Sequence, residues 1–211
     1  MFRNREDAGE QLAAVLDGFN GKETVVLAIP RGGLPLGAII ASSLKAPLDV
    51  AITKKIGHPN NKEYAIGALS MEGTFINPNV DVSPEYIEKE SQKVRKQVEE
   101  RYRQYYGKTK PHDLKDKWVI IVDDGIATGS TVLATVSLVA QSRPKGIVVA
   151  VPVAPPQTLE RLQQEPGIDR VVCLQTPWNF MGVGQFYEDF EPVSDREAIT
   201  ILEDASLNDL S

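Results

Sequence analysis

The sequence predicts an α/β fold in which helices flank a central, Rossmann-like parallel sheet. Short apolar runs rich in β-branched residues alternate with helical segments along the 211 residues, which is the order of strands joined by crossover helices. The run Trp118–Val122 is almost wholly apolar, as suits a strand buried on both faces of a parallel sheet. No linker or internal repeat divides the chain, so we expect a single domain over 1–211 with its core over about 20–175.

The first half of the chain is expected to supply two strands, a hairpin and three helices. The pattern predicts a helix over 5–17, strands over 24–29 and 48–53 around a helix at about 34–44, a hairpin over 64–77, and a helix over 84–106. Leu12, Val15 and Leu16 lie on the apolar side expected of the first helix. Glu72-Gly73 is the expected turn of the hairpin. The many charges of the helix over 84–106 indicate a solvated face rather than a binding surface.

The second half continues the alternation of strands and helices. It is expected to contain a strand over 118–122, a helix to about 142, strands over 147–153 and 170–175 separated by a helix over 157–165, and a final helix. Capping residues mark two helix starts. Ser83-Pro84 precedes the long charged helix, and Ser194 with Glu197 forms a capping box before the last helix.

Composition excludes several classes of function. A formal charge of −6 and a pI near 5.1 argue against general nucleic-acid binding, which needs a basic face. Cys173 is accompanied only by His58 and His112, so neither an internal disulfide nor a zinc cluster is expected. The amino terminus has no apolar signal core, and no run is long enough to cross a membrane. We therefore expect a cytoplasmic protein, with Cys173 as a small buried core residue.

The stretch VIIVDDGIATGST at 119–131 carries the clearest chemical signal. Asp123 and Asp124 directly follow the apolar strand, at the edge of the sheet where open α/β folds bind ligands. The small residues after them leave backbone N–H groups uncovered at the start of a helix, which suits an anion. Carboxylates beside such a loop suit hydroxyls or a hydrated Mg²⁺. The alternative is a plain turn with solvated acids.

This stretch closely resembles the phosphoribosyl-diphosphate (PRPP) binding motif of type I phosphoribosyltransferases: a hydrophobic strand, an acidic pair, and small residues ending in T-G-x-T. The whole chain is also similar to bacterial proteins described as predicted phosphoribosyltransferases. The resemblance implies that Asp123 and Asp124 face the ribose 2′- and 3′-hydroxyls and their Mg²⁺, which they reach indirectly. It also implies a phosphate-binding loop made of Gly125, Ile126, Ala127, Thr128, Gly129, Ser130 and Thr131.

Two further segments are expected at the same edge of the sheet. The loop that ends in Arg31, Gly32 and Gly33 lets a ligand approach the main chain and offers a planar donor fork suited to a diphosphate. In the resembled family a loop at this point binds pyrophosphate, often through a cis peptide. Lys54 and Lys55 close the second predicted strand, where their charge can neutralise departing diphosphate, and they resemble the basic pair before the mobile loop of orotate phosphoribosyltransferases. A surface arginine and solvated lysines are the alternatives.

Residues 56–75 occupy the place where the resembled family carries a flexible lid. A lid is useful because water would otherwise capture the oxocarbenium-like sugar. Lys62, Glu63 and Tyr64 are the residues expected to reach the site when the lid closes. An inert surface hairpin is the alternative.

Residues 176–211 resemble the small hood that covers the base in this family, with a contribution expected from the amino-terminal helix. Trp178 and Phe180 offer aromatic rings on which a flat base can stack. The alternative is that these aromatics pack into a small satellite core.

One departure from the family pattern bears on the acceptor. In 6-oxopurine phosphoribosyltransferases the similar loop carries an acid three residues after its acidic pair, where this chain has Ala127. The loop looks closer to the adenine and orotate branches, which have a small residue there. The resemblance therefore points away from hypoxanthine and guanine without naming the acceptor.

Taken together, the sequence predicts a Mg²⁺-dependent transferase that moves a 5-phosphoribosyl group from PRPP to a nitrogenous base or amine and releases pyrophosphate. Arg31, Lys54, Asp123 and Asp124 are the expected catalytic residues, and no covalent nucleophile is needed. A PRPP- or nucleotide-sensing regulator and a hydrolase of PRPP or a nucleotide are the alternatives. The expected partners are small molecules, not nucleic acids or membranes, and the resemblance implies a homodimer.

Overall fold

A five-stranded parallel sheet forms the centre of the computed structural model, which describes residues 1–107 and 110–208. Its strands are β1 (Thr24–Ala28), β2 (Leu48–Val50), β6 (Trp118–Val122), β7 (Gly146–Val153) and β8 (Arg170–Gln175). They lie in the order β2-β1-β6-β7-β8, and every neighbouring pair is parallel. All five carboxyl ends therefore lie at one edge of the sheet.

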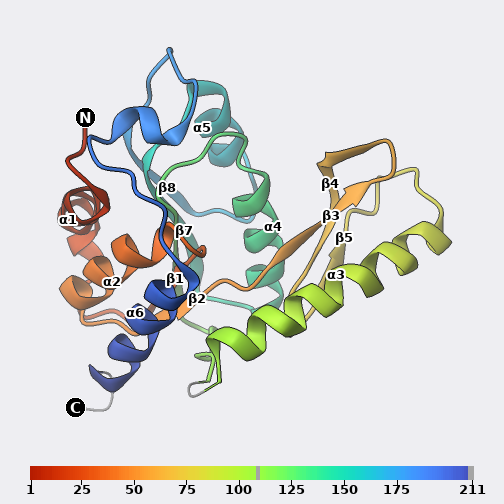
Figure 1. The fold of residues 1–211 in the computed structure, drawn as a ribbon, viewed down its shortest axis with the longest axis horizontal. Coiled ribbons are helices and arrows are strands. Elements are labelled where there is room, and N and C mark those ends of the chain that lie inside the picture. The colour runs from red at the N-terminus through yellow and green to blue at the C-terminus, as the bar shows by residue number, and fades with distance from the viewer. Residues whose placement is uncertain (108–109, 209–211) are drawn as a thin grey trace.

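Helices cover both faces of this sheet (Figure 1). One face carries α1 (Arg5–Leu16), α2 (Gly33–Leu44) and α6 (Asp195–Asn208), and the other carries α4 (Ser130–Val139) and α5 (Pro156–Gln163). Short 3-10 helices lie at Asp17–Phe19, Ala140–Ser142 and Val183–Phe186. None of the helices in the described ranges is long and apolar enough to cross a bilayer.

The central strands are apolar throughout because both of their faces are covered. Successive residues of a strand point to opposite faces. In β6, Ile120 and Val122 belong to the apolar cluster beneath α1 and α2, whereas Val119 and Ile121 belong to the cluster beneath α4. All four side chains are fully buried, which explains why this run shows no polar alternation.

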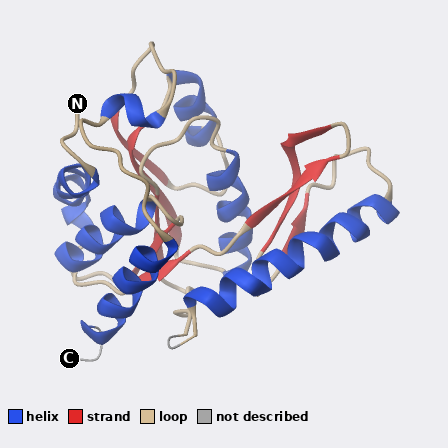
Figure 2. Cartoon of the chain, viewed as in Figure 1, coloured by secondary structure: helices blue, strands red, loops and turns tan. Residues whose placement is uncertain are grey.

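A second, antiparallel sheet projects from the core together with a long helix (Figure 2). The sheet consists of β3 (Lys54–His58), β4 (Asn61–Leu69) and β5 (Thr74–Ile76), and the helix is α3 (Pro84–Tyr105). Val94 and Val98 of α3 pack against Ile56, Ile66 and Leu69 of the small sheet. The charged helix thus buries a narrow apolar stripe and exposes the rest of its surface.

The predicted fold class and most predicted elements are confirmed. The strands at 118–122 and 170–175 match their predicted bounds, and the other predicted helices and strands differ mainly at their ends. The hydroxyl of Ser83 accepts the amide of Tyr86 and caps α3. Ser194 and Glu197 form the predicted capping box, because each side chain accepts the other residue's amide.

The predicted end of the second strand is wrong. The strand β2 ends at Val50, and Lys54 and Lys55 begin β3 of the small sheet instead of closing a core strand. The segment Ala51–Thr53 crosses from one sheet to the other. Since Ala51 and Ile52 continue the apolar run of β2, the sequence pattern does not reveal the boundary.

The prediction that Val15 shares the buried side of α1 is also wrong. Its side chain is 45% exposed, whereas Ala8, Leu12 and Leu16 are fully buried. These three residues are spaced by four and form one row along the helix. Val15 lies to one side of that row and is turned toward solvent.

This difference along α1 gives a matched test of packing. We expect Leu12→Ala to lower the free energy of unfolding by about 2–4 kcal/mol, because it leaves a cavity in the core. Val15→Ala should change it by less than about 0.5 kcal/mol. Urea denaturation of both variants measures the difference, and equal losses would contradict the described orientation of α1.

Candidate active site

The candidate site lies where the chain leaves adjacent strands in opposite directions. From β1 it continues through α2 to β2, and from β6 it continues through α4 to β7 on the other side. Because α2 and α4 cover opposite faces, the loops at 29–33 and 123–131 separate at neighbouring strand ends. Open α/β sheets bind their ligands at such a switch point.

The loop 123–131 is shaped by glycines and by the burial of Ile126. Gly125 has a φ of 152° and Gly129 a φ of 73°, values that residues with a Cβ rarely adopt. The side chain of Ile126 is buried, and its amide donates to the carbonyl of Val153 at 2.9 Å. The sequence placed Ile126 among the phosphate donors, but in this structure its amide is occupied.

The accessible polar groups of this loop gather at the start of α4. Thr128 and Thr131 are exposed and Ser130 is half-buried. Oγ1 of Thr128 lies 3.2 Å from Oγ of Ser130. The first amides of a helix have no intrahelical acceptor, and the helix dipole is positive at this end. The arrangement can therefore hold an anion such as a phosphate.

Arg5, which the sequence did not single out, holds the second acid of the pair. From the start of α1 it places Nε and Nη2 each 2.9 Å from Oδ2 of Asp124. Its Nη1 donates to the carbonyl of Glu191 at 2.7 Å, and its guanidinium lies 4.0 Å from the centre of the Phe190 ring. The Arg5 and Asp124 side chains are only 11% and 14% exposed. One carboxylate oxygen of Asp124 is thus fixed in a buried ion pair.

Burial makes the acidic pair costly to ionise. Burial, followed by the negative charge of Asp124, holds the pKa of Asp123 well above its usual range. Burial also raises the pKa of Asp124, although Arg5 opposes this shift. Oδ1 of Asp123 accepts the amide of Asp124 at 2.9 Å. Perturbed carboxyls of this kind favour a bound cation or hydroxyl donors and are typical of functional sites.

Glycines allow the loop 29–33 to lie against these acids. A Cβ on Gly32 would overlap the carboxylate of Asp124, and one on Gly33 would lie 2.5 Å from the carbonyl oxygen of Val122. The peptide bond between Pro30 and Arg31 is cis, as the family resemblance implied for this loop. Larger residues at the two glycines would push the two loops apart.

Arg31 lies beside residues from α3 and α6. Its Nη1 is 3.8 Å from Oδ2 of Asp195, and the other oxygen of Asp195 accepts a hydrogen bond from Arg101 at 2.7 Å. The hydroxyl of Tyr105 donates to that same oxygen at 3.4 Å, and burial raises its pKa to about 12. Asp195 therefore holds two guanidinium groups near the site, and Arg101 is one that sequence reasoning missed.

A small cavity of about 160 Å³ connects these segments. Its lining includes Pro30, Thr53, Lys54, Arg101, Tyr105 and Thr131. Lys54 also donates to Oε1 of Gln97 at 2.9 Å. Lys55, the next residue of β3, points to the opposite face of the strand. At the carboxyl-terminal end of α3, Arg101 and Tyr105 thus line this cavity, so the helix is not uniformly solvated there.

The segment after β8 folds over the loop 123–131 and joins the amino terminus. The hydroxyl of Tyr187 donates to the carbonyl of Asp124 at 2.6 Å. Val183 packs so closely on Gly125 that a Cβ there would lie 2.6 Å from it. Phe2 forms a β-bridge with Tyr187, and their rings are 5.4 Å apart. Tyr187 is another contact that the sequence did not indicate.

The two aromatic candidates in this segment have different surroundings. Trp178 is 85% exposed, whereas Phe180 stacks on Phe186 with ring centres 5.5 Å apart. Trp178 does not belong to any apolar cluster formed by the described residues. The alternative of a satellite core therefore does not account for Trp178.

The candidate lid residues lie on the small sheet. Lys62 is in hydrogen-bonding contact with the hydroxyl of Tyr86 and lies 3.2 Å from Oε1 of Glu90, both on α3. Tyr64 is exposed, with its ring 5.9 Å from that of His58. The side chain of Glu63 lies outside the described part of the structure. In this arrangement Lys62 and Tyr64 contact residues of the small sheet and α3, and neither lines the 160 Å³ cavity.

The acids of the site do not form a metal cage by themselves. Across 1–107 and 110–208, no group of three or more His, Cys, Asp or Glu side chains is placed to hold a metal ion. A Mg²⁺ ion at Asp123 and Asp124 would need further oxygen ligands from a substrate or from water, which is how Mg²⁺ commonly binds.

Residues 3–187 match the model of the phosphoribosyl transferase domain, so the chain belongs to this family. The resemblance seen in the sequence is thereby confirmed. The five-stranded parallel sheet with helices on both faces agrees with it.

Similar proteins occur in Mycobacterium tuberculosis and Thermus thermophilus. Two Mycobacterium tuberculosis proteins, from strains H37Rv and CDC 1551, are named only provisionally as phosphoribosyl transferases and are 37% identical over 210 residues. The matches cover 97% of this chain but 47% of each relative, so the chain spans about half their length. The crystal structure of TT1426 from Thermus thermophilus is 36% identical with a TM-score of 0.89, covering 97% of this chain and 98% of that one.

The ion pair of Arg5 can be tested by removing one partner. We expect Arg5→Met to lower the free energy of unfolding by about 3–5 kcal/mol, because Asp124 is left buried without its counter-charge. Arg3→Met is the control, because Arg3 lies two residues before Arg5 and its ion pair with Asp7 is exposed. Its free energy of unfolding should stay close to that of the wild type. In guanidinium denaturation, Arg5→Met/Asp124→Asn should recover part of the loss; no recovery would show that the ion pair is not the cause.

The raised pKa of Asp123 predicts a pH dependence of stability. A carboxyl with a raised folded pKa contributes stability at low pH, below its unfolded pKa, and this contribution is lost as pH rises toward the folded pKa. Asp123→Asn should therefore have a higher free energy of unfolding than the wild type at pH 7.5. At pH 4.5 the difference should be smaller, because the wild-type carboxyl is then largely protonated in the folded state. Urea denaturation at both pH values measures this, with the exposed Asp17→Asn as control; a larger gain at the lower pH would contradict the prediction.

Proposed function

We propose that this protein transfers a 5-phosphoribosyl group from PRPP to a nitrogen atom of a base or amine and releases pyrophosphate. Membership of the family supports a transferase in general. The observation that carries the proposal is the close meeting of the loops 29–33 and 123–131 at the switch point of the sheet. The loop 123–131 offers an acidic pair and the amino terminus of a helix. The loop 29–33 offers Arg31 and two glycines without side chains.

The loop 123–131 would hold the phosphorylated sugar. The amides at the start of α4 and the hydroxyls of Thr128, Ser130 and Thr131 would bind the 5′-phosphate. Asp123 and the remaining oxygen of Asp124 would accept hydrogen bonds from the ribose hydroxyls. Such donors offset the cost of ionising buried carboxyls.

The loop 29–33 and its neighbours would hold the leaving diphosphate. As the bond to the anomeric carbon breaks, negative charge accumulates on the diphosphate, and preorganised donors lower the barrier most where charge develops. Arg31, Lys54 and the backbone at Gly32 would take this role, whereas the amide of Gly33 donates to the carbonyl of Ile29 at 3.0 Å and is not a free donor here. Arg101 adds a further positive group on the same side of the small cavity.

Mg²⁺ fits this site as an ion carried by the diphosphate, and when bound it would supply positive charge to the leaving group. The buried pair Asp123 and Asp124 suits an ion held through water or through the ribose hydroxyls. The chain's own contribution is to keep these two acids adjacent and fixed, the second of them by Arg5.

The remaining parts of the site would handle the acceptor and exclude water. The exposed ring of Trp178 is available for stacking on a flat base. The small sheet with α3 would close over the sugar and keep water away from the cationic carbon. The small residue Ala127 resembles the residue at this position in the adenine and orotate branches, so an acceptor of their kind is favoured over hypoxanthine and guanine. The identity of the base is left to the screen below.

A pyrophosphate-release screen with PRPP, Mg²⁺ and a panel of purines, pyrimidines and small amines tests the proposal. Release that depends on one acceptor supports it. Calorimetric binding of PRPP without release across the panel would instead indicate a sensor. Release in the absence of every acceptor would indicate a hydrolase.

The role of Arg31 gives a sharper prediction once an acceptor is known. Arg31→Ala should lower turnover by about 10²–10³-fold, the typical loss for one preorganised donor to developing charge. Because Arg31 is partly exposed, thermal unfolding should change little. Arg161→Ala, on the exposed surface of α5, is the matched control; full turnover and PRPP affinity in Arg31→Ala would refute the role.

A further inference from the structure

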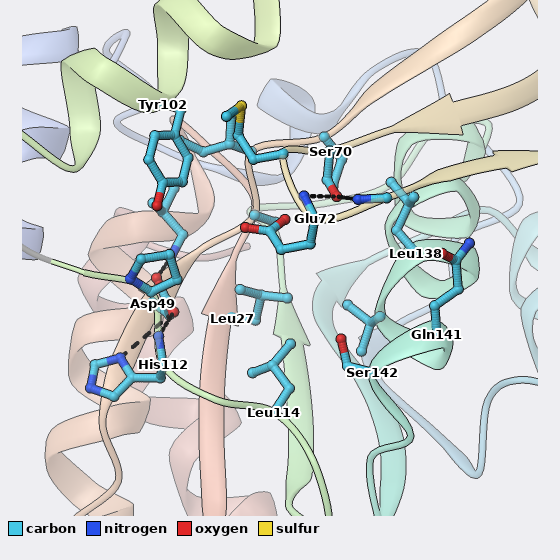
Figure 3. A pocket seen from close by; sticks show the side chains of 18 of the residues that line it. Leu27, Asp49, Ser70, Glu72, Tyr102, His112, Leu114, Leu138, Gln141 and Ser142 are labelled. Atoms are coloured by element: carbon cyan, nitrogen blue, oxygen red, sulfur yellow. Dashed lines mark hydrogen bonds and ion pairs between the residues drawn. The ribbon is translucent and has the colours of Figure 1, made fainter. Parts of the chain in front are cut away.

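A second and larger cavity, of about 490 Å³, lies on the α4 side of the central sheet (Figure 3). Its apolar floor includes Leu27 of β1, Leu138 of α4 and Leu114. The described residues that line it include none from the loops 29–33 and 123–131. Its volume falls in the range of natural small-molecule sites, yet nothing in the proposed reaction uses it.

A buried carboxylate forms one wall of this cavity. Asp49 of β2 is 3% exposed. It accepts the amides of Val50 and His112 at 2.8 and 2.7 Å, and also the hydroxyl of Tyr106. Nδ1 of His112 lies 3.6 Å away. While His112 is neutral these donors carry no formal charge, so they fix the negative charge of Asp49 without cancelling it.

Two more acids and two aromatic rings line the cavity. Glu72, in the turn between β4 and β5, and Asp113, beyond α3, are both lining residues. Figure 3 shows the carboxylate of Glu72 turned toward the side that holds Tyr102 and Asp49. The rings of Tyr102 and Tyr106 have centres 4.7 Å apart. Among the lining residues in the described ranges, none is Lys or Arg.

The pKa values of the two tyrosines are raised in this environment. Burial, followed by the charges of Glu72 and Asp49, raises the pKa of Tyr102. Burial, followed by the charge of Asp49, also raises the pKa of Tyr106. The same field would repel a phosphate-bearing ligand and attract a positively charged one. PRPP and nucleotides are therefore poor candidates for this cavity.

We propose that this cavity binds a small organic cation whose charge lies on nitrogen, such as an amidinium, a guanidinium or a protonated amine. The carboxylates accept its N–H groups, the tyrosine rings offer their faces to its charge, and the leucine floor receives its hydrocarbon part. This site is separate from the phosphoribosyl site, and its test does not require catalysis.

Isothermal titration of the full chain with benzamidine and with benzamide tests the proposal. The two compounds have nearly the same shape, and only benzamidine is charged near neutral pH. We expect benzamidine to bind at least about tenfold more tightly, since carboxylates attract only the charged compound. Its affinity should also fall when NaCl is raised from about 50 to about 500 mM.

A variant in the exposed turn locates the site without disturbing the core. Glu72→Gln should weaken benzamidine about fivefold and leave benzamide unchanged. Glu88→Gln, on α3 outside the cavity, is the matched control and should leave both affinities unchanged. Equal affinities for the two compounds, undetectable benzamidine binding, or unchanged benzamidine affinity in Glu72→Gln would overturn the proposal. The last result would place the cation elsewhere, for example at Asp123 and Asp124.

Discussion

Two neighbouring carboxylates are largely removed from solvent where the sheet divides, and much of the surrounding structure makes this tolerable. A buried charge is costly unless it is paired and hydrogen-bonded. Arg5 supplies the counter-charge for Asp124, and the amide of Asp124 supplies a donor for Asp123. Gly32 leaves the space that the Asp124 carboxylate fills. The pair remains harder to ionise than exposed acids, so it is poised to gain from hydroxyl donors or a cation.

The same ion pair joins parts of the chain that are far apart in sequence. Arg5 belongs to the first helix, Asp124 to the central loop, and Phe190 and Glu191 to the segment after β8. Tyr187 adds a hydrogen bond to the backbone of Asp124. The acidic pair is thus fixed from the amino-terminal and carboxyl-terminal sides at once, while the small sheet and α3 approach from another side with Lys54 and Arg101. The part of the site that contains the acidic pair and the part that contains Lys54 and Arg101 are therefore built from different elements.

The sequence predicted the parts of the site that rest on local patterns. The apolar strand, the acidic pair and the small residues at 119–131 are contiguous, so their spacing alone indicates a strand, a loop and a helix start. Arg5 left no such signal, because it lies 119 residues from Asp124 and only the tertiary fold brings them together. Arg101 resembled any other charge on a solvated helix. The sequence did not reveal the crossing from β2 to β3, because an apolar run looks the same whether it continues one strand or leads into the next sheet.

The segment Ala51–Thr53, which crosses between the two sheets, is a wall of both cavities. It leads directly into Lys54, and Oγ1 of Thr53 lies 2.9 Å from Oγ1 of Thr135 on α4. An occupant that shifted these three residues in one cavity would also change the wall of the other, and any coupling free energy that resulted between two occupants would be equal in both directions. The two cavities thus lie one short segment apart, with Ala51–Thr53 as their common wall.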